Sequence, residues 1–347
     1  MSGGVDSSVS LMLLKKAGYE VSGVSLKFDT WKCSRRENVC CSEQSFCLAK
    51  KIAASYGVNH RIIDARSLFS KEVIGYFKEE LKNNRTPSPC VFCNPKVKFL
   101  SLLKYADEIG AEFVATGHYA QVEESEIFSK KQVVLKRGRD KEKDQSYSLS
   151  FLTQKELKRI IFPLGELTKR EVYEIAKQNK IFNVYKKIKQ SQDFCFLDAK
   201  DYSRFIDQQL RPSGGPIVDI QGRQIGSHHG LMQYTLGQRK GIGLAGGPFY
   251  VVAKKSPNIL VVSTHRQDTF KNKAILKPCN LINKPPKEQI NILVKARSSE
   301  KLHRARLSIE NEHLVLHYKK PVSQLVPGQI AVFYKGDICL GAGVING

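Results

Sequence analysis

Apolar residues in the first 200 positions alternate between short continuous runs, typical of strands, and stretches with helical spacing. The runs predict strands at residues 21–28, 60–64 and 112–116. The helical spacing predicts helices at residues 8–16, 44–56, 67–81, 96–109, 156–161 and 169–179. Because strands that alternate with helices build parallel sheets, we expect an α/β fold with a doubly wound parallel sheet that ends near residue 200.

The pattern changes after residue 211, where Pro-Ser-Gly-Gly-Pro is typical of a loop. The residues up to about 247 are rich in Gly, Gln and His with little periodicity, which indicates a small insert domain. Short apolar runs separated by turns then predict a small antiparallel β-barrel, with strands at residues 249–253, 259–263, 290–295, 304–308, 313–317 and 329–334. We therefore expect three domains, at residues 1–203, 204–270 and 271–347.

The chain of 347 residues carries 56 Lys and Arg against 33 Asp and Glu, a net charge of +23. This excess favours a polyanionic partner such as nucleic acid, although a genome that favours lysine would give the same number. No apolar stretch approaches the roughly 18–20 residues of a membrane-spanning helix, and we expect a cytoplasmic protein. Nine cysteines, an odd number, argue against a disulfide framework and leave thiols for metal binding or nucleophilic chemistry.

The sequence Ser-Gly-Gly-Val-Asp-Ser-Ser at residues 2–8 lies at the start of the first predicted helix. Two glycines allow close approach of the backbone to an anion, the serines offer hydroxyls, and the helix N-terminus directs N–H groups toward it. The Gly-Lys-Ser/Thr ending of the nucleoside-triphosphatase P-loop is missing, which argues against transfer of a γ-phosphate. The segment resembles the loop of the ATP pyrophosphatase family, which splits ATP between the α and β phosphates; a simple Ser/Gly-rich helix cap is the alternative. In that family a buried strand precedes the loop, so we expect a start upstream of Met1.

Eight further sequence motifs are spread along the chain between residues 86 and 343. They are Thr-Pro-Ser-Pro-Cys-Val-Phe-Cys-Asn at 86–94, Ala-Thr-Gly-His-Tyr at 115–119, Lys-Asp-Gln-Ser-Tyr at 143–147, Phe-Pro-Leu-Gly at 162–165, Ser-Gln-Asp-Phe-Cys-Phe at 191–196, Gly-Leu-Met-Gln-Tyr-Thr-Leu-Gly-Gln-Arg-Lys-Gly at 230–241, Pro-Gly-Gln at 327–329 and Gly-Ala-Gly at 341–343. Together they resemble the tRNA-specific 2-thiouridylase family, which replaces the 2-oxo group of the wobble uridine by sulfur. The resemblance implies an ATP-pyrophosphatase catalytic domain of the adenine-nucleotide hydrolase type, a central tRNA-binding domain and a C-terminal barrel.

The resemblance also implies residue roles. ATP, with Mg²⁺, would be bound by Ser2, Gly3, Gly4, Val5, Asp6, Ser7, Ser8, Leu26 and Gly117. Cys195 would carry a persulfide, with Cys93 as its partner thiol. The tRNA would be contacted by Ser88, Pro89, Cys90, Lys143, Asp144, Gln145, Arg297 and Ser298, and selected through His118 and Gln329. The expected partners are tRNA and a protein that donates persulfide or sulfide.

This chemistry also follows from the reaction itself. Adenylation of the uridine 2-oxygen makes it a good leaving group, and Mg²⁺ offsets the triphosphate charge. Sulfur delivery needs a thiolate or persulfide, and a second thiol releases the sulfur by forming a disulfide. Two other functions remain open: an amide-forming or amino-acid-transferring ligase with the same loop, which has no use for the two cysteines, and a non-catalytic RNA-binding protein that senses nucleotide.

Cys90 stands where the better-known form of the family has Asp. Cys90, Cys93 and Cys195 would suit three-point binding of a [4Fe-4S] cluster, whose open iron could hold a hydrosulfide. Zinc at these thiols, or a substitution without metal, is the alternative. A zinc site at Cys33, Cys40, Cys41 and Cys47 is conceivable, but incidental loop cysteines are the favoured interpretation because no histidine is nearby.

Overall fold

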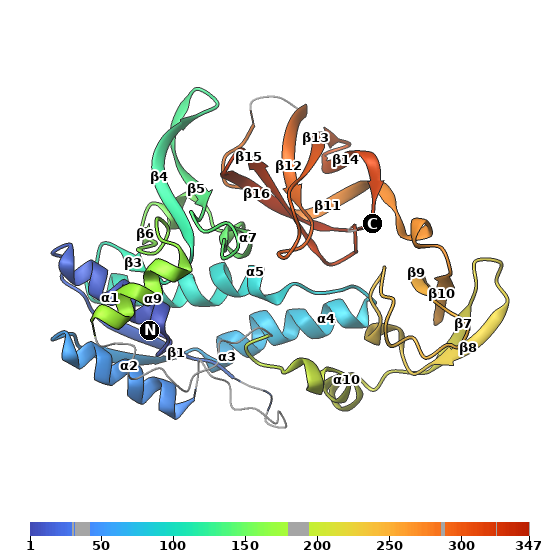
Figure 1. The fold of residues 1–347 in the computed structure, drawn as a ribbon, viewed down its shortest axis with the longest axis horizontal. Coiled ribbons are helices and arrows are strands. Elements are labelled where there is room, and N and C mark those ends of the chain that lie inside the picture. Colours follow the sequence, from blue (N-terminus) through green and yellow to red (C-terminus); the bar gives the residue numbers. More distant parts are fainter. Residues whose placement is uncertain (30, 32–41, 180–193, 286–288, 324, 347) are drawn as a thin grey trace.

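The computed structural model describes residues 1–29, 31, 42–179, 194–285, 289–323 and 325–346, and the structural statements below concern these residues. Figure 1 shows three parts. An N-terminal α/β part occupies the left and the centre, a barrel lies above the centre, and a small central sheet lies at the right.

The helices of the α/β part are α1 Val5–Lys16, α2 Glu43–Ser55, α3 Arg66–Phe69, α4 Tyr76–Lys82, α5 Pro89–Cys93, α6 Leu100–Glu108, α7 Ser146–Leu149, α8 Gln154–Leu157, α9 Lys169–Gln178 and α10 Tyr202–Leu210. Helices α1, α2, α6 and α9 lie close to the predicted ranges, and α3 and α4 lie in the range predicted at 67–81, whereas α5, α7 and α10 were not predicted. The predicted helices at 67–81 and 96–109 each contain a π-helical turn, at Ser70–Gly75 and at Asn94–Phe99. Helix α9 begins at the expected cap, where Thr168 and Glu171 form a reciprocal capping box.

The strands of the α/β part pair in parallel, as predicted, but in two separate pairs. Strand β1 (Gly23–Lys27) pairs with β2 (His60–Asp64), and β3 (Val114–Ala115) pairs with β6 (Ile160–Ile161). Four residues precede α1, and Met1 among them bonds to Val24 and Ser25 of β1. Within the described residues, no hydrogen-bonded strand joins these pairs into the continuous doubly wound sheet that we expected.

The helix predicted at 156–161 is wrong. Its first part belongs to α8, whereas Ile160 and Ile161 form β6, because the parallel contact with β3 takes precedence over their helical spacing. The sequence pattern also missed the hairpin of β4 (Ala120–Ile127) and β5 (Lys130–Arg137). Its turn residues Phe128 and Ser129 both have positive φ, 51° and 58°, without the Gly or Asn that usually marks such a turn.

The central sheet has four strands in the order β8-β7-β10-β9, with β7 and β10 parallel. They are β7 Gly215–Val218, β8 Gln224–His228, β9 Tyr250–Lys255 and β10 Ile259–Ser263. The pattern predicted only the last two, and its assignment of them to the barrel is wrong, because β9 and β10 pair with each other and β10 pairs with β7 in this separate sheet. Buried Ile217, Val251 and Leu260 give this part a core of its own.

The predicted antiparallel barrel is confirmed, with six strands in the order β11-β14-β13-β12-β15-β16 and closure between β11 and β16. The strands are β11 Lys271–Leu281, β12 Gln289–Lys295, β13 His303–Glu310, β14 His313–Val322, β15 Ile330–Lys335 and β16 Ile338–Ile345. The pattern missed β11 and β16, the two strands that close it. Strand β16 also pairs with β5, so the hairpin of the α/β part continues the barrel sheet.

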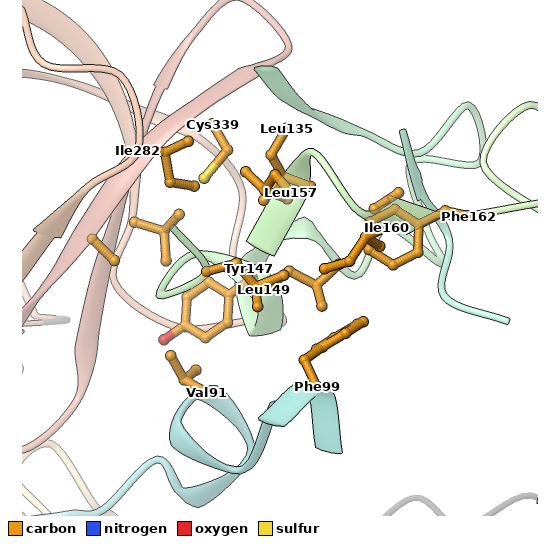
Figure 2. Close-up of a cluster of buried hydrophobic side chains, with 14 of the residues drawn as sticks. Val91, Phe99, Leu135, Tyr147, Leu149, Leu157, Ile160, Phe162, Ile282 and Cys339 are labelled. Atoms are coloured by element: carbon orange, nitrogen blue, oxygen red, sulfur yellow. The ribbon is translucent and has the colours of Figure 1, made fainter. Parts of the chain in front are cut away.

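One hydrophobic core connects the α/β part with the barrel (Figure 2). Val91 of α5 and Tyr147 of α7 lie on one side, and Ile282 and Cys339 of the barrel lie on the other. The Tyr147 hydroxyl donates a hydrogen bond to the Ile330 carbonyl of β15, 2.9 Å away. The barrel is therefore packed onto the face of the α/β part that carries α5.

Candidate active site

The Ser2–Ser8 loop opens helix α1 and rests on helix α2. Gly4 is the extended residue before the helix, and the Ser7 and Ser8 hydroxyls each donate to its carbonyl at 3.0 Å. Gly3 has φ +70°, and a Cβ there would lie 2.5 Å from the Ser45 carbonyl oxygen. Only glycine fits this backbone position, because the loop lies directly against the backbone of α2.

Asp6 in this loop is the centre of a polar network that the sequence pattern did not reveal. The Lys169 ammonium lies 2.6 and 2.8 Å from its two carboxylate oxygens, and the Tyr119 hydroxyl donates to it at 2.8 Å. Burial and the negative charge of Asp6 raise the pKa of Tyr119, which keeps the phenol protonated. Gly117 packs closely against Asp6, because a Cβ at Gly117 would lie 3.0–3.2 Å from Asp6 atoms.

Lys169 is the first residue of α9, and its side chain is only 12% exposed. The sequence around Thr168 predicts the start of this helix, but only the packing of α9 on α1 shows that the lysine faces the loop. Leu26, the other expected ATP-binding residue, lies half-buried at the C-terminal end of β1, the end at which open α/β sheets bind ligands.

The two cysteines of the predicted sulfur relay lie against one aromatic core. Phe77 of α4 is its centre, with ring centroids 5.4 Å from Phe194 and 5.3 Å from Phe196. Cys93, at the end of α5, is a buried member of this core, and the half-buried Cys195 packs against it. The fold therefore brings two residues that are 102 positions apart in the sequence into the same small region.

The expected three-thiol site is not assembled in the described part of the chain. Cys90 lies one turn before Cys93 on α5, but its side chain is exposed whereas Cys93 is buried. Within the described ranges no three His, Cys, Asp or Glu side chains lie close enough together to hold a metal ion. The three thiols therefore do not fit a [4Fe-4S] cluster or zinc in this conformation. Of the other cysteine group, Cys33, Cys40 and Cys41 lie outside the described residues, and Cys47 is exposed on α2.

The predicted tRNA-contacting residues at 143–145 differ in what their side chains do. Lys143 is exposed, whereas Asp144 is an internal ion-pair partner whose side chain is 1% exposed. The Asp144 carboxylate accepts from the Arg137 guanidinium at 3.0 Å and from two backbone N–H groups. Gln145 exchanges hydrogen bonds with the Tyr119 backbone, at 2.9 and 3.0 Å. Asp144 and Gln145 thus hold the loop that presents Lys143.

The remaining expected contacts lie on α5 and in the barrel. Ser88 precedes α5 and Pro89 is its buried first residue. Arg297 is half-buried and Ser298 is exposed in the loop after β12, where the Arg297 carbonyl accepts from the Glu300 N–H at 3.1 Å.

Three family descriptions match consecutive parts of the chain. They are the tRNA methyl transferase HUP domain at residues 1–199, the tRNA methyl transferase PRC-barrel domain at 203–264 and the aminomethyltransferase beta-barrel domain at 271–345. A protein of Caldanaerobacter subterraneus subsp. tengcongensis named tRNA-specific 2-thiouridylase MnmA 1 is 39% identical over 100% of this chain and 96% of its own length. The chain belongs to the tRNA-specific 2-thiouridylase family. Relatives with that name in Persephonella marina and Treponema denticola are 39% and 38% identical, over 99% and 100% of this chain and 98% and 96% of their own lengths.

Membership of this family confirms the predicted order of parts along the chain: an α/β domain, an inserted domain and a C-terminal barrel. In the described ranges, no helix has the length and apolar character needed to cross a membrane.

Two residues that the resemblance links to tRNA selection are directed toward the protein. The His118 imidazole lies 2.8 Å from the Thr116 hydroxyl, and its ring centroid lies 6.0 Å from Phe99 and 5.9 Å from Phe162. Burial, together with the charge of Lys98, lowers the pKa of His118 to about 3, so the ring is neutral. Gln329 donates its side-chain amide to the Thr86 carbonyl at 3.0 Å.

Proposed function

We propose that the protein catalyses the ATP-dependent 2-thiolation of uridine at the wobble position of tRNA. The observation that carries this proposal is that Cys93 and Cys195 both pack into one hydrophobic core, on a fold that also presents the Ser2–Ser8 loop. Full-length relatives that are 39% identical and named tRNA-specific 2-thiouridylase support it. An amide-forming ligase would have the loop but no use for the two thiols.

ATP would bind at the loop, with Ser2, Gly3, Gly4, Val5, Asp6, Ser7 and Ser8 around the phosphates, and Leu26 and Gly117 as further contacts. Lys169 fixes the Asp6 carboxylate, and Mg²⁺ would offset the phosphate charge when bound. The uridine 2-oxygen would attack the α-phosphorus, and the bond to pyrophosphate would break. The adenylated oxygen then leaves as AMP in the next step.

The Cys195 thiolate would attack the outer sulfur of a persulfide on a sulfur-donor protein, whose own thiolate leaves, so that Cys195 then carries the persulfide. The terminal sulfur would attack C2 of the adenylated uridine, and AMP would leave with the former 2-oxygen. The Cys93 thiolate would then attack the Cys195 Sγ, which breaks the sulfur–sulfur bond and leaves the terminal sulfur on C2. The products are 2-thiouridine and a Cys93–Cys195 disulfide, and a thiol reductant is needed to restore both thiols.

The tRNA would be held across residues 1–203, 204–270 and 271–347, acting as catalytic, central tRNA-binding and barrel domains. Lys143, Arg297 and Ser298 offer side chains for it, and the net charge of +23 suits an RNA backbone. Ser88, Pro89 and Cys90 would approach the target base. We place these events in the cytoplasm, where tRNA and ATP are available.

The test uses purified protein, ATP, a persulfide donor, a thiol reductant and unmodified tRNA. We expect tRNA-dependent release of AMP and pyrophosphate and one 2-thiouridine per tRNA. Cys195→Ser should abolish thiolation and keep tRNA binding, whereas Cys279→Ser, at an exposed cysteine on β11, is the matched control. Pyrophosphate release without any thiolated uridine would contradict the proposal and favour a different acceptor.

A further inference from the structure

The linker between α4 and α5, residues 83–88, belongs to the α/β part but is held by the other two parts. From the central sheet, the Lys254 ammonium donates to the Asn84 carbonyl at 3.1 Å. The Thr86 hydroxyl lies 3.3 Å from the hydroxyl of Thr235, which belongs to the 230–241 motif of the central part. Both contacts join residues about 150 or more positions apart, so they exist only in the assembled protein.

The barrel holds the same linker more closely. The Thr86 N–H donates to the Pro327 carbonyl at 2.9 Å, and the Gln329 amide donates to the carbonyls of Thr86 and Pro87 at 3.0 and 3.4 Å. Between Pro327 and Gln329 lies Gly328, with φ +88°, and a Cβ on this residue would lie 2.8–2.9 Å from linker atoms. The two backbones are therefore in direct contact, and any larger residue would separate them.

The linker leads directly into α5, whose five residues form the first turn of a helical segment that continues through the π-helical turn Asn94–Phe99 into α6. The first turn of a helix lacks intrahelical partners for its N–H groups, so its position depends on the residues before it and on packing. The buried Cys93 ends this first turn. Movement of the linker would therefore disturb the turn that carries the thiol.

We propose that Gln329 and Lys254 are positioning residues that fix α5, and through it Cys93, by holding the linker from two other parts of the protein. This inference rests on the proposed function, because thiolation is what makes Cys93 a reacting group. It gives Gln329 a role inside the protein, different from the tRNA contact that the family resemblance implies. The catalytic geometry is then complete only when all three parts are in place.

The chain offers a matched control for Gln329. The Gln154 amide also bridges the α/β part and the barrel, through the Val133 and Ile282 carbonyls at 2.6 and 3.1 Å, but it lies away from the linker. Gln329→Leu and Gln154→Leu should therefore lower thermal stability similarly. Only Gln329→Leu should lower kcat for thiolation, by roughly tenfold, as expected for carbonyls left without a donor, with KM for tRNA unchanged.

A second readout does not depend on tRNA. Alkylation by iodoacetamide, followed by mass spectrometry of individual peptides, should modify Cys93 several-fold faster in Gln329→Leu than in Gln154→Leu, because a loosened α5 exposes the buried thiol. The exposed Cys90 on the same helix is the internal reference. Lys254→Met should give the same acceleration, and Lys254→Arg should restore the original rate, which keeps the test valid if Gln329→Leu does not fold.

Equal Cys93 alkylation and equal kcat in the two glutamine variants would overturn the inference. A defect in KM for tRNA alone would do so as well, and would make Gln329 a tRNA contact. If the wild type fails to thiolate tRNA, the proposed function is wrong, but the alkylation rates still decide whether the linker positions α5.

Discussion

Replacement of Gly3 by alanine tests whether the Ser2–Ser8 loop must follow its observed path. Alanine at φ +70° is strained by about 1–2 kcal/mol. In addition, its Cβ would lie 2.5 Å from the Ser45 carbonyl oxygen, which belongs to the backbone of α2 and cannot rotate away. The loop would have to shift by about 0.9 Å to reach an ordinary contact distance of about 3.4 Å.

Gly18→Ala is the matched control, because Gly18 has φ +85° but a Cβ there meets nothing within 4 Å. Both variants should lose about 1 kcal/mol of stability from the backbone strain, seen as a drop of roughly 2–4 °C in thermal unfolding. Only Gly3→Ala should also change the chemistry. Displacement of catalytic groups by close to 1 Å costs up to about a hundredfold in rate.

The assay is tRNA-dependent release of pyrophosphate at varied ATP concentration. We expect kcat/KM for ATP to fall roughly 10- to 100-fold in Gly3→Ala and to stay within twofold of wild type in Gly18→Ala. Equal kcat/KM values in the two variants would refute the reasoning, because they would show that the reaction with ATP does not depend on the path of this loop.

Three further predictions concern the site. Lys169→Met removes the cation from Asp6 and should raise KM for ATP about tenfold. The control Lys177→Met, at an exposed position on the same helix, should leave KM for ATP unchanged. An unchanged KM in both variants would exclude the Asp6 network from ATP binding. Cys93→Ser should leave tRNA-dependent pyrophosphate release intact and, in a single-turnover reaction without thiol reductant, stop after the attack on C2. The tRNA is then held on Cys195 through a sulfur–sulfur bond, which a non-reducing gel retains and added thiol cleaves; turnover at the wild-type rate would remove Cys93 from the relay. The pKa of His118 is lowered to about 3 in the folded protein, whereas in the unfolded chain an ordinary His pKa is about 6.5. As the pH decreases, His118 of the unfolded chain is therefore protonated before His118 of the folded protein. The stability of the fold should then fall as the pH decreases from about 6.5 toward 3. His118→Gln should flatten this part of the stability curve, and parallel curves would contradict the burial of a neutral imidazole.

How much the sequence predicts depends on whether a feature is local. The anion loop, the α9 cap at Thr168 and most barrel strands follow from neighbouring residues, and the structure has them where expected. The hairpin β4–β5 was missed because its turn residues take positive φ without Gly or Asn, so no local signal marks it. Ile160 and Ile161 changed from helix to strand because their partner, β3, is about 45 positions away.

The site shows the same division. The motifs predict Cys93 and Cys195 as candidate sulfur carriers, and the structure packs both against the aromatic core around Phe77. No pattern could place Lys169 beside Asp6, which is 163 positions earlier in the sequence. Nor could spacing alone show that Cys90 is exposed while Cys93 is buried, since both lie on one helical turn.

The pairing of β16 with β5 cannot form until synthesis of the chain is almost complete. Ile338 and Cys339 pair with Lys136 and Leu135, so the two strands are about 200 residues apart in the sequence. At a synthesis rate of roughly 5–20 residues per second, the hairpin leaves the ribosome about 10–40 s before its partner strand exists. During that interval the edge of β5 exposes backbone groups that could pair with another nascent chain. Conditions that slow translation near the C-terminus should therefore lower the yield of soluble protein before they affect the activity of each folded molecule.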